Sequence, residues 1–241
     1  MCEEKENLFW FDGFPCKKIG AGEVSIVRDE PGIFKEHTIY GNVDPIKCFE
    51  KDVVIPKYAL DEATKTKYKI TQIGPSVFNN AENIETLKIP DSVSDMDWCF
   101  WGCDSLKEIR VDSNNVNYCD VQGVVYSKDR KVLLVFPPAY PAEEYHILPA
   151  TREIGNLAFK TASRLKKLFV PNSVQSIGIN AFYGCSALEH VYIEGKLKYF
   201  GGNNEGDYYP QDTVFHYQGK EMNLGELAKE VNKKIENSTV I

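Results

Sequence analysis

The side chains that most often carry catalysis or bind metals are present in this chain, but not in the patterns that such chemistry needs. The seven cysteines include no C-x-x-C pair and the four histidines are scattered, so we expect no tetrahedral zinc site. Gly20-Ala21-Gly22 lacks the third glycine of a dinucleotide-binding loop and is interpreted as a turn. Glu143 and Glu144 are adjacent, and neighbours in an extended chain point apart. We therefore interpret them as solvated carboxylates and not as an acid–base pair.

Two weaker candidates for chemistry remain. The segment 203–207 (Asn-Asn-Glu-Gly-Asp) carries the oxygen ligands that calcium prefers, but it does not match an EF-hand loop. A hydrolase site within residues 1–52 or in the C-terminal loop is the second. Because the chain has no G-x-S-x-G motif and no P-loop, the main expectation is a protein that is not an enzyme, with no catalytic residue, metal or cofactor.

Composition argues against two further classes. The chain has 28 Lys and Arg against 35 Asp and Glu, a formal net charge of −7, whereas a nucleic-acid binder would show a concentrated basic face. No apolar run approaches the roughly 18 residues of a membrane span, since the run 132–136 ends at two prolines. With 43% hydrophobic residues, the 241-residue chain can bury a sizeable core in one or two domains.

The start of the chain allows two interpretations. Met1-Cys2-Glu3-Glu4 has no apolar segment typical of a signal peptide, which suits a native cytosolic start. A cysteine followed by acidic residues is also how a mature bacterial lipoprotein begins, which would place a lipid anchor at Cys2. The odd number of cysteines leaves the redox compartment open, and most of them are interpreted as small core residues.

One block of residues recurs along the chain. It begins with Ile-Gly, places a Phe four residues after the glycine, and ends in the pattern L-x-x-L-x-I. Clear copies start at Ile73, Ile154 and Ile177, and a degenerate copy starts at Met96. The Phe recurs after 22 residues from Phe78 to Phe100 and after 23 residues from Phe159 to Phe182, a period typical of stacked repeats. The gap of 59 residues between Phe100 and Phe159 equals one repeat of 23 and about 36 extra residues.

Simple packing rules predict the structure of this repeat. The L-x-I centre is a short strand whose alternate side chains face inward, and the Phe fills the same interior from the turn side. Small residues stand where neighbouring coils approach closely, namely Ala81, Cys103, Ala162 and Cys185. The glycine after each isoleucine indicates a tight turn. Since no coil buries its face alone, the coils must stack around one core, in a right-handed solenoid.

The full pattern, I-G-x-x-A-F-x-x-C-x-x-L-x-x-I-x-I-P-x-S-V, resembles the BspA-like leucine-rich repeat family from about Val53 to Ile193. The resemblance implies a strand-rich α/β fold, a leucine-rich repeat solenoid with one parallel sheet face and short helical or irregular turns opposite. Family members are mostly secreted or surface proteins of host-associated microbes that mediate adhesion and protein contacts. The resemblance therefore implies an extracellular or cell-surface protein, with a cytoplasmic location as the alternative.

Three regions follow from the pattern: an N-terminal cap of short strands at 1–52, the solenoid at 53–200, and a C-terminal loop with a capping helix at 201–241. An insert at about 113–144 is predicted to form a β-hairpin that turns near Lys128-Asp129-Arg130. Asn223, with Glu226 three residues later, is typical of a helix start. The apolar stripe that follows is expected to seal the last coil; its alternative is a partner-binding or dimer helix.

The candidate binding residues come from the middle position of each strand, which must face outward onto the concave sheet. They are Lys88, Arg110, His146, Phe169 and Tyr192, with Lys167 and His190 beside them. Exposed aromatic residues and arginine are enriched at binding hot spots, although lysine and tyrosine also suit an ordinary solvated sheet face.

The expected partner is a protein, with a host extracellular protein as the candidate. A glycan bound by Phe169, Tyr192 or the Tyr208-Tyr209 pair is one alternative, and an intracellular scaffold is another.

Overall fold

The computed structural model describes residues 8–27, 50–75, 77–78, 81–96, 100, 102–201 and 212–236. For residues 234–236 it describes the backbone alone. The chain divides into two compact units, Met1–Tyr118 and Cys119–Ile241. Several expectations concern residues outside the described ones: the anchor at Cys2, the segment 203–207, the Tyr208-Tyr209 pair and the part of the N-terminal cap between 28 and 49.

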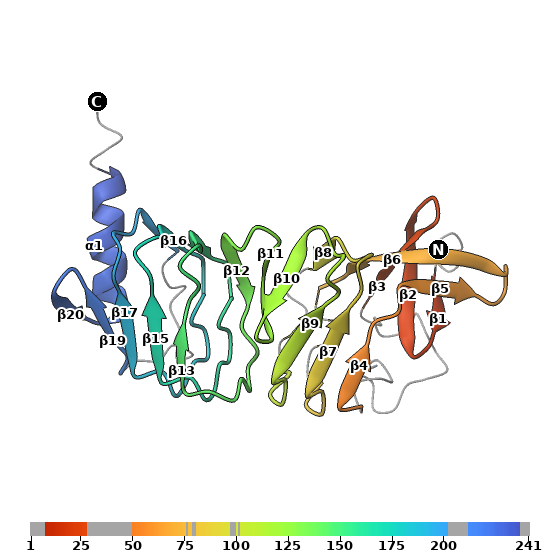
Figure 1. Ribbon diagram of the computed structural model, residues 1–241, viewed down its shortest axis with the longest axis horizontal. Coiled ribbons are helices and arrows are strands. Elements are labelled where there is room, and N and C mark those ends of the chain that lie inside the picture. The colour runs from red at the N-terminus through yellow and green to blue at the C-terminus, as the bar shows by residue number, and fades with distance from the viewer. Residues whose placement is uncertain are drawn as a thin grey trace. The chain divides into compact units, whose positions relative to one another are not determined.

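The centres of the repeats form parallel strands on one face of each unit (Figure 1). In the first unit these are β4 (Asp52–Val54), β7 (Thr86–Ile89) and β9 (Glu108–Val111). In the second they are β13 (Glu144–His146), β15 (Lys167–Val170), β17 (His190–Ile193) and β19 (Val214–Tyr217). The inward residues are buried, except for the half-buried Val111, and the middle residues are at least partly exposed, so the predicted leucine-rich repeat solenoid is confirmed.

A second row of short strands lies at the Ile-Gly positions, which the pattern did not predict. In the first unit β8 (Asp95–Met96) pairs in parallel with β6 (Thr66–Ile73). In the second unit β14 (Glu153–Ile154), β16 (Ser176–Ile177) and β18 (Tyr199–Phe200) continue in parallel from β12 (Val132–Val135). With two residues in most of these strands, alternation is too brief to be recognised in the sequence.

Short antiparallel strands precede the first coil. They are β1 (Leu8–Phe11), β2 (Phe14–Gly20) and β3 (Glu23–Ile26), and β3 joins β6 in parallel, with β5 (Tyr58–Asp61) at the other edge. The predicted turn follows β2, where Gly22 has a φ of 82°. The Lys18 ammonium lies 2.9 Å from the nearly buried Asp61 carboxylate, so this ion pair links β2 to β5.

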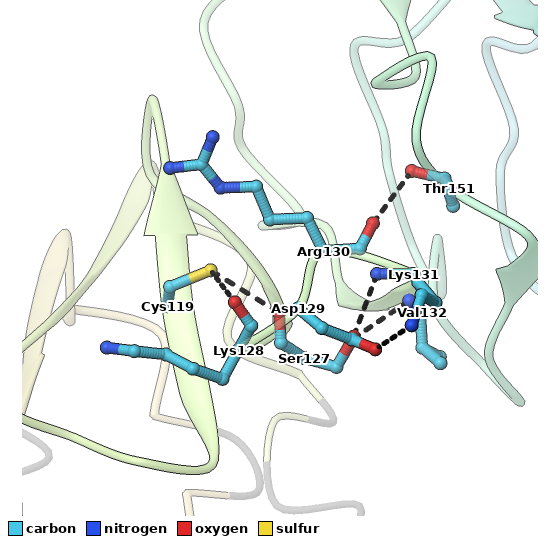
Figure 2. Close-up of polar contacts among 8 residues, drawn as sticks. All are labelled: Cys119, Ser127, Lys128, Asp129, Arg130, Lys131, Val132 and Thr151. Atoms are coloured by element: carbon cyan, nitrogen blue, oxygen red, sulfur yellow. Dashed lines mark hydrogen bonds and ion pairs between the residues drawn. The ribbon is translucent and has the colours of Figure 1, made fainter.

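The insert forms the predicted hairpin and also joins the solenoid. β10 (Tyr118–Val121) and β11 (Val124–Ser127) lead into β12, and the chain turns at residues 128–130. The Asp129 carboxylate accepts hydrogen bonds from the Ser127 hydroxyl at 2.8 Å and the Lys131 amide at 3.1 Å, which holds the turn closed (Figure 2). Because β12 pairs with β14, the insert supplies the first strand of the second row in this unit.

Asn115, at the start of the insert, is the most fully bonded buried polar side chain of the first unit's final coil. It has no exposed surface. Its amide nitrogen donates to the Pro90 and Val93 carbonyls at 3.0 and 2.8 Å, and its oxygen accepts from the Asn117 and Tyr118 amides, both at 2.9 Å. One side chain therefore fixes the chain on both sides of the turn that leaves the solenoid.

Phenylalanines and cysteines of the repeat occupy the interior. In the second unit, Phe159 and Phe182 of the repeat stand between Phe136 of the insert and Phe215 of β19, and successive ring centroids are 4.9, 5.8 and 5.8 Å apart. The thiol of Cys185 donates to the Phe159 carbonyl of the preceding coil at 2.9 Å, and Cys103 does the same to Phe78 in the first unit. Burial raises the pKa of the Cys185 thiol to about 12. These cysteines are small core residues, as expected.

The glycine of the Ile-Gly motif is needed for close approach and not for a left-handed turn. Gly155 and Gly178 are absent from the residues with positive φ. A Cβ on Gly178 would lie 2.5 Å from the amide nitrogen of Asn156 and 2.7 Å from the carbonyl carbon of Gly155. A side chain at this position would therefore push neighbouring coils apart, which corrects the expected reason for the glycine.

The C-terminal end covers the last coil. β19 is followed by the antiparallel β20 (Lys220–Met222) and by α1 (Leu224–Glu236), which packs on β18 and β19 (Figure 1). The helix begins with the predicted capping box, because Asn223 and Glu226 each accept the other's backbone N–H at 2.9 Å. Leu224, Leu227 and Val231 are buried in the core.

Candidate binding surface

Four ring side chains stand in one row on the sheet of the second unit. Strand register places His146 opposite Phe169, Phe169 opposite Tyr192, and Tyr192 opposite His216. His146 is exposed and the other three are partly exposed, while the residues on either side of them along the strands are buried. We refer to these four residues as the aromatic row.

The rings of the aromatic row are stacked. The centroid distances and interplanar angles are 4.1 Å and 2° for His146–Phe169, 4.9 Å and 10° for Phe169–Tyr192, and 4.3 Å and 8° for Tyr192–His216. Strands in a sheet lie about 4.8 Å apart, so the backbone itself holds successive rings at stacking distance. Each face of Phe169 and of Tyr192 is therefore turned toward a neighbouring ring, and the row offers its edges and tips to solvent.

Polar contacts set the orientation of the last ring. The Nε2 atom of His216 lies 3.2 Å from Nδ1 of His190, and one ring donates the hydrogen while the other accepts it. The Nδ1 atom of His216 lies 3.5 Å from the Glu221 carboxylate on β20. With both nitrogens engaged, His216 is fixed as the terminal member of the stack.

Ion pairs flank the row at the start of the strands. Lys167 lies 2.7 Å from Glu144 on the neighbouring strand, and Lys166 lies 2.9 Å from Glu143. The hydrogen bond from Lys167 lowers the pKa of Glu144 and raises that of the lysine. The adjacent glutamates therefore pair with separate lysines, which agrees with their interpretation as solvated carboxylates and not as an acid–base pair. Lys167 stays charged, and its charge is balanced by Glu144.

Lys88 and Arg110 belong to the first unit. They are exposed, and they lie directly opposite each other on β7 and β9. The Arg110 guanidinium bonds the Glu108 carboxylate of its own strand at 2.7 Å. The sheet of this unit therefore presents Lys88 beside an arginine that is paired with Glu108, whereas the sheet of the second unit presents the aromatic row.

His216 is the member of the aromatic row that the sequence pattern missed. Its strand reads Val-Phe-His-Tyr, which ends in tyrosine where the repeat has isoleucine or valine, and it follows a loop in place of a complete repeat. The signal that could have found it is the spacing. Phe215 lies 24 residues after Val191, close to the repeat period, and the two residues pair in register.

Two kinds of arrangement are absent from the described residues. Among them, no group of three or more His, Cys, Asp or Glu side chains is placed to hold a metal ion. The helix in the described part of the chain is not long and apolar enough to cross a membrane.

Sequence comparison decides the family. Residues 55–122 and 140–204, more than half of the chain, match the BspA type leucine rich repeat region in six copies. The chain belongs to the BspA-type leucine-rich repeat family. No curated protein matches it.

Several solved structures are similar to this BspA-type chain at low identity. The pneumococcal vaccine antigen PcpA is 16% identical, with 81% of this chain and 78% of that chain covered and a TM-score of 0.47. A leucine-rich repeat protein from Eubacterium ventriosum is 16% identical, with 85% and 70% covered and a TM-score of 0.46. A leucine-rich cell surface protein from Faecalibacterium prausnitzii is 13% identical, with 85% and 86% covered and a TM-score of 0.33.

The BspA-type repeats contain most of the candidate residues. Lys88 and Arg110 lie within the first matched stretch, and His146, Phe169 and Tyr192 lie within the second. His216 lies beyond both. The aromatic row thus combines three repeat positions with one from the C-terminal coil.

Proposed function

We propose that this BspA-type protein is a non-enzymatic recognition module that binds a partner protein through the aromatic row. The observation that carries the proposal is the stack of four partly exposed rings from His146 to His216. Large aromatic side chains gathered at the centre of a surface are typical of binding hot spots.

Preorganisation favours binding at this row. An aromatic side chain has two rotatable χ angles, and stacking restricts both before any partner arrives. Ordering side chains at an interface otherwise costs about 0.5–1.5 kcal/mol for each flexible residue. The Phe169 and Tyr192 rings therefore contribute contact area at a small entropic cost.

The same stacking favours a protein over a neutral glycan at this row. A sugar packs its C–H face on the open face of an aromatic ring. In Phe169 and Tyr192 both faces are turned toward neighbouring rings at 4.9 Å or less. The exposed edges, which carry the positive part of the ring quadrupole, suit carbonyl oxygens and apolar side chains of a polypeptide.

The proposal includes the location of the protein. Membership of the BspA-type family supports a cell-surface or secreted adhesion protein with a host extracellular protein as the partner. A lipid anchor at Cys2 is part of the same proposal. Detection of the protein on intact cells by surface labelling, with loss of labelling after Cys2→Ser, tests the location separately from binding.

Binding of the purified chain to a panel of host extracellular proteins, measured by biolayer interferometry, tests the function. Phe169→Ala/Tyr192→Ala truncates two hot-spot side chains and should weaken binding to any panel protein that binds the wild type, by about a hundredfold or more. Tyr192→Phe keeps the ring and should retain most of the affinity. Calorimetry of each variant checks that it is folded.

The matched control is Lys88→Ala/Arg110→Ala, which changes the equivalent strand positions of the first unit. If this control loses binding while the aromatic double variant binds like the wild type, the proposal is wrong and the first unit carries recognition. If the wild type binds neutral glycans and no protein on the panel, the assignment of a protein partner is wrong.

A further inference from the structure

A corner of the second unit brings exposed basic residues from successive coils into one column. The amide of Arg152 donates to the Lys131 carbonyl at 2.7 Å, that of Gln175 to the Arg152 carbonyl at 2.8 Å, and that of Lys198 to the Gln175 carbonyl at 2.7 Å. These four residues precede β12, β14, β16 and β18, and all are exposed. Backbone bonding thus stacks them at the strand spacing of about 4.8 Å.

The hairpin turn extends the column by one arginine. Arg130 has a φ of 59°, and its carbonyl accepts a hydrogen bond from Thr151 at 3.5 Å, one residue before Arg152. Figure 2 shows its side chain extending away from the bonded turn, while Lys131 is paired with Asp129 at 2.8 Å. Arg130 is exposed and its guanidinium lies on the side of the turn away from Thr151, whereas the charge of Lys131 is paired with that of Asp129.

The charge balance of this corner is positive. Arg130, Arg152, Lys196 and Lys198 are exposed and form no ion pair with any described residue; we call these four residues the basic corner. The exposed acidic residues nearest in sequence are Glu153 and Glu194, since Asp129 is used by Lys131. A local excess of cations stands out on a chain whose formal net charge is −7.

We propose that the basic corner binds a sulfated oligosaccharide. Arginine and lysine at the ends of long side chains bind sulfate oxygens through charge-assisted hydrogen bonds, and arginine does so with two parallel donors. A monosaccharide unit is about as long as the spacing between neighbouring strands, so a linear sulfated chain lying along the column meets one coil per sugar. The small neutral neighbours Ala150 and Ser173 leave this corner without the apolar centre that a protein epitope needs.

The length and surroundings of the corner limit the ligand. From the turn that carries Arg130 to Lys198 the column spans three strand spacings, or about 14 Å, which matches a short oligosaccharide. A duplex nucleic acid needs a longer basic face, and the acidic remainder of this chain would repel it. This site is independent of the aromatic row and of the proposed function.

Isothermal titration with a heparin-derived hexasaccharide in 0.1 M NaCl tests the proposal. Arg152→Gln/Lys198→Gln should weaken binding about fivefold or more, since two exposed ion pairs are lost. Gln175→Lys fills the neutral step of the column and should tighten binding. Raising the salt to 0.5 M should weaken the wild-type complex.

The controls carry the same charge changes in the first unit. The control for Arg152→Gln/Lys198→Gln is Lys51→Gln/Lys65→Gln, and the control for Gln175→Lys is Asn117→Lys. Each control changes the net charge as its test variant does and should leave the affinity for the hexasaccharide unchanged. Equal losses in the two double variants would show general electrostatic attraction and overturn the site. Binding of a poly-glutamate decapeptide as tight as that of the hexasaccharide would overturn the ligand class, and so would absence of hexasaccharide binding by the wild type.

Discussion

Replacing Asn115 by alanine is expected to destabilise the first unit more than almost any other substitution of one polar side chain. The side chain is fully buried and makes four hydrogen bonds, two as donor to Pro90 and Val93 and two as acceptor from the backbone beyond it. The alanine variant removes all four bonds, and the Pro90 carbonyl keeps only its 3.4 Å bond from the Val93 amide. The neighbouring Val116 is 75% exposed and provides a control on the same turn.

The magnitude follows from these contacts. A hydrogen bond contributes about 1 kcal/mol net, and a buried group left unsatisfied costs about 1–3 kcal/mol. Water can reach the amides of Asn117 and Tyr118, which lie on more exposed residues, so their loss is partly compensated. We expect Asn115→Ala to lower the free energy of unfolding by about 3 kcal/mol, or the melting temperature by about 10 °C.

Calorimetric unfolding at pH 7 measures this loss, with Val116→Ala expected within about 0.5 kcal/mol of the wild type. Asn115→Asp sharpens the test, because a carboxylate would face the carbonyls of Pro90 and Val93. Its deficit should shrink at low pH, where the protonated acid regains one donor. A loss below about 1 kcal/mol for Asn115→Ala would refute the reasoning that this side chain holds the turn.

Two further predictions concern the backbone and the charges. Gly178→Ala should lower the free energy of unfolding by about 3 kcal/mol, because its Cβ would lie 2.5 Å from the Asn156 amide nitrogen. Gly20→Ala, whose Cβ would have nothing within 4 Å, should be nearly neutral. Equal losses for the two variants in calorimetry would contradict the close-approach argument. Lys18 lowers the pKa of Asp61, so this carboxylate stabilises the fold above its ordinary pKa and the stabilisation is lost as the pH falls through the lowered value. Asp61→Asn should therefore cost about 2 kcal/mol at pH 7 and progressively less below pH 4, whereas a pH-independent deficit in denaturant titrations would speak against the ion pair.

The repeat made most of the fold predictable. The phase of Ile-Gly, Phe and L-x-x-L places β7 and β9 on one face of the first unit and β15 and β17 on one face of the second. Burial of Leu168 and Val191 confirms this phase. The second strand row escaped prediction because two residues such as Glu153 and Ile154 cannot show alternation. The role of the Ile-Gly glycine in close approach was also not predicted, because the distance between coils depends on how they stack. One copy of the repeat does not contain that information.

The candidate site was predictable to a smaller extent. Alternation along each strand identifies Phe169 and Tyr192 as outward residues, since that property is local. The stacking with His216 depends on a coil whose pattern is degenerate, and the contact with Glu221 depends on a hairpin that follows it. Whether the aromatic row binds a protein stays a prediction for the binding experiment.

The stack also ties the length of the aromatic row to the number of coils in the second unit. Each coil of the second unit contributes one outward ring and one interior phenylalanine, and both series advance by one strand spacing. Duplicating the coil that carries β15 would therefore lengthen the outer stack and the inner column by one ring each. The number of repeats would therefore set the length of ligand that the surface can contact. The residue at one outward position in each coil would set the chemistry that the surface recognises.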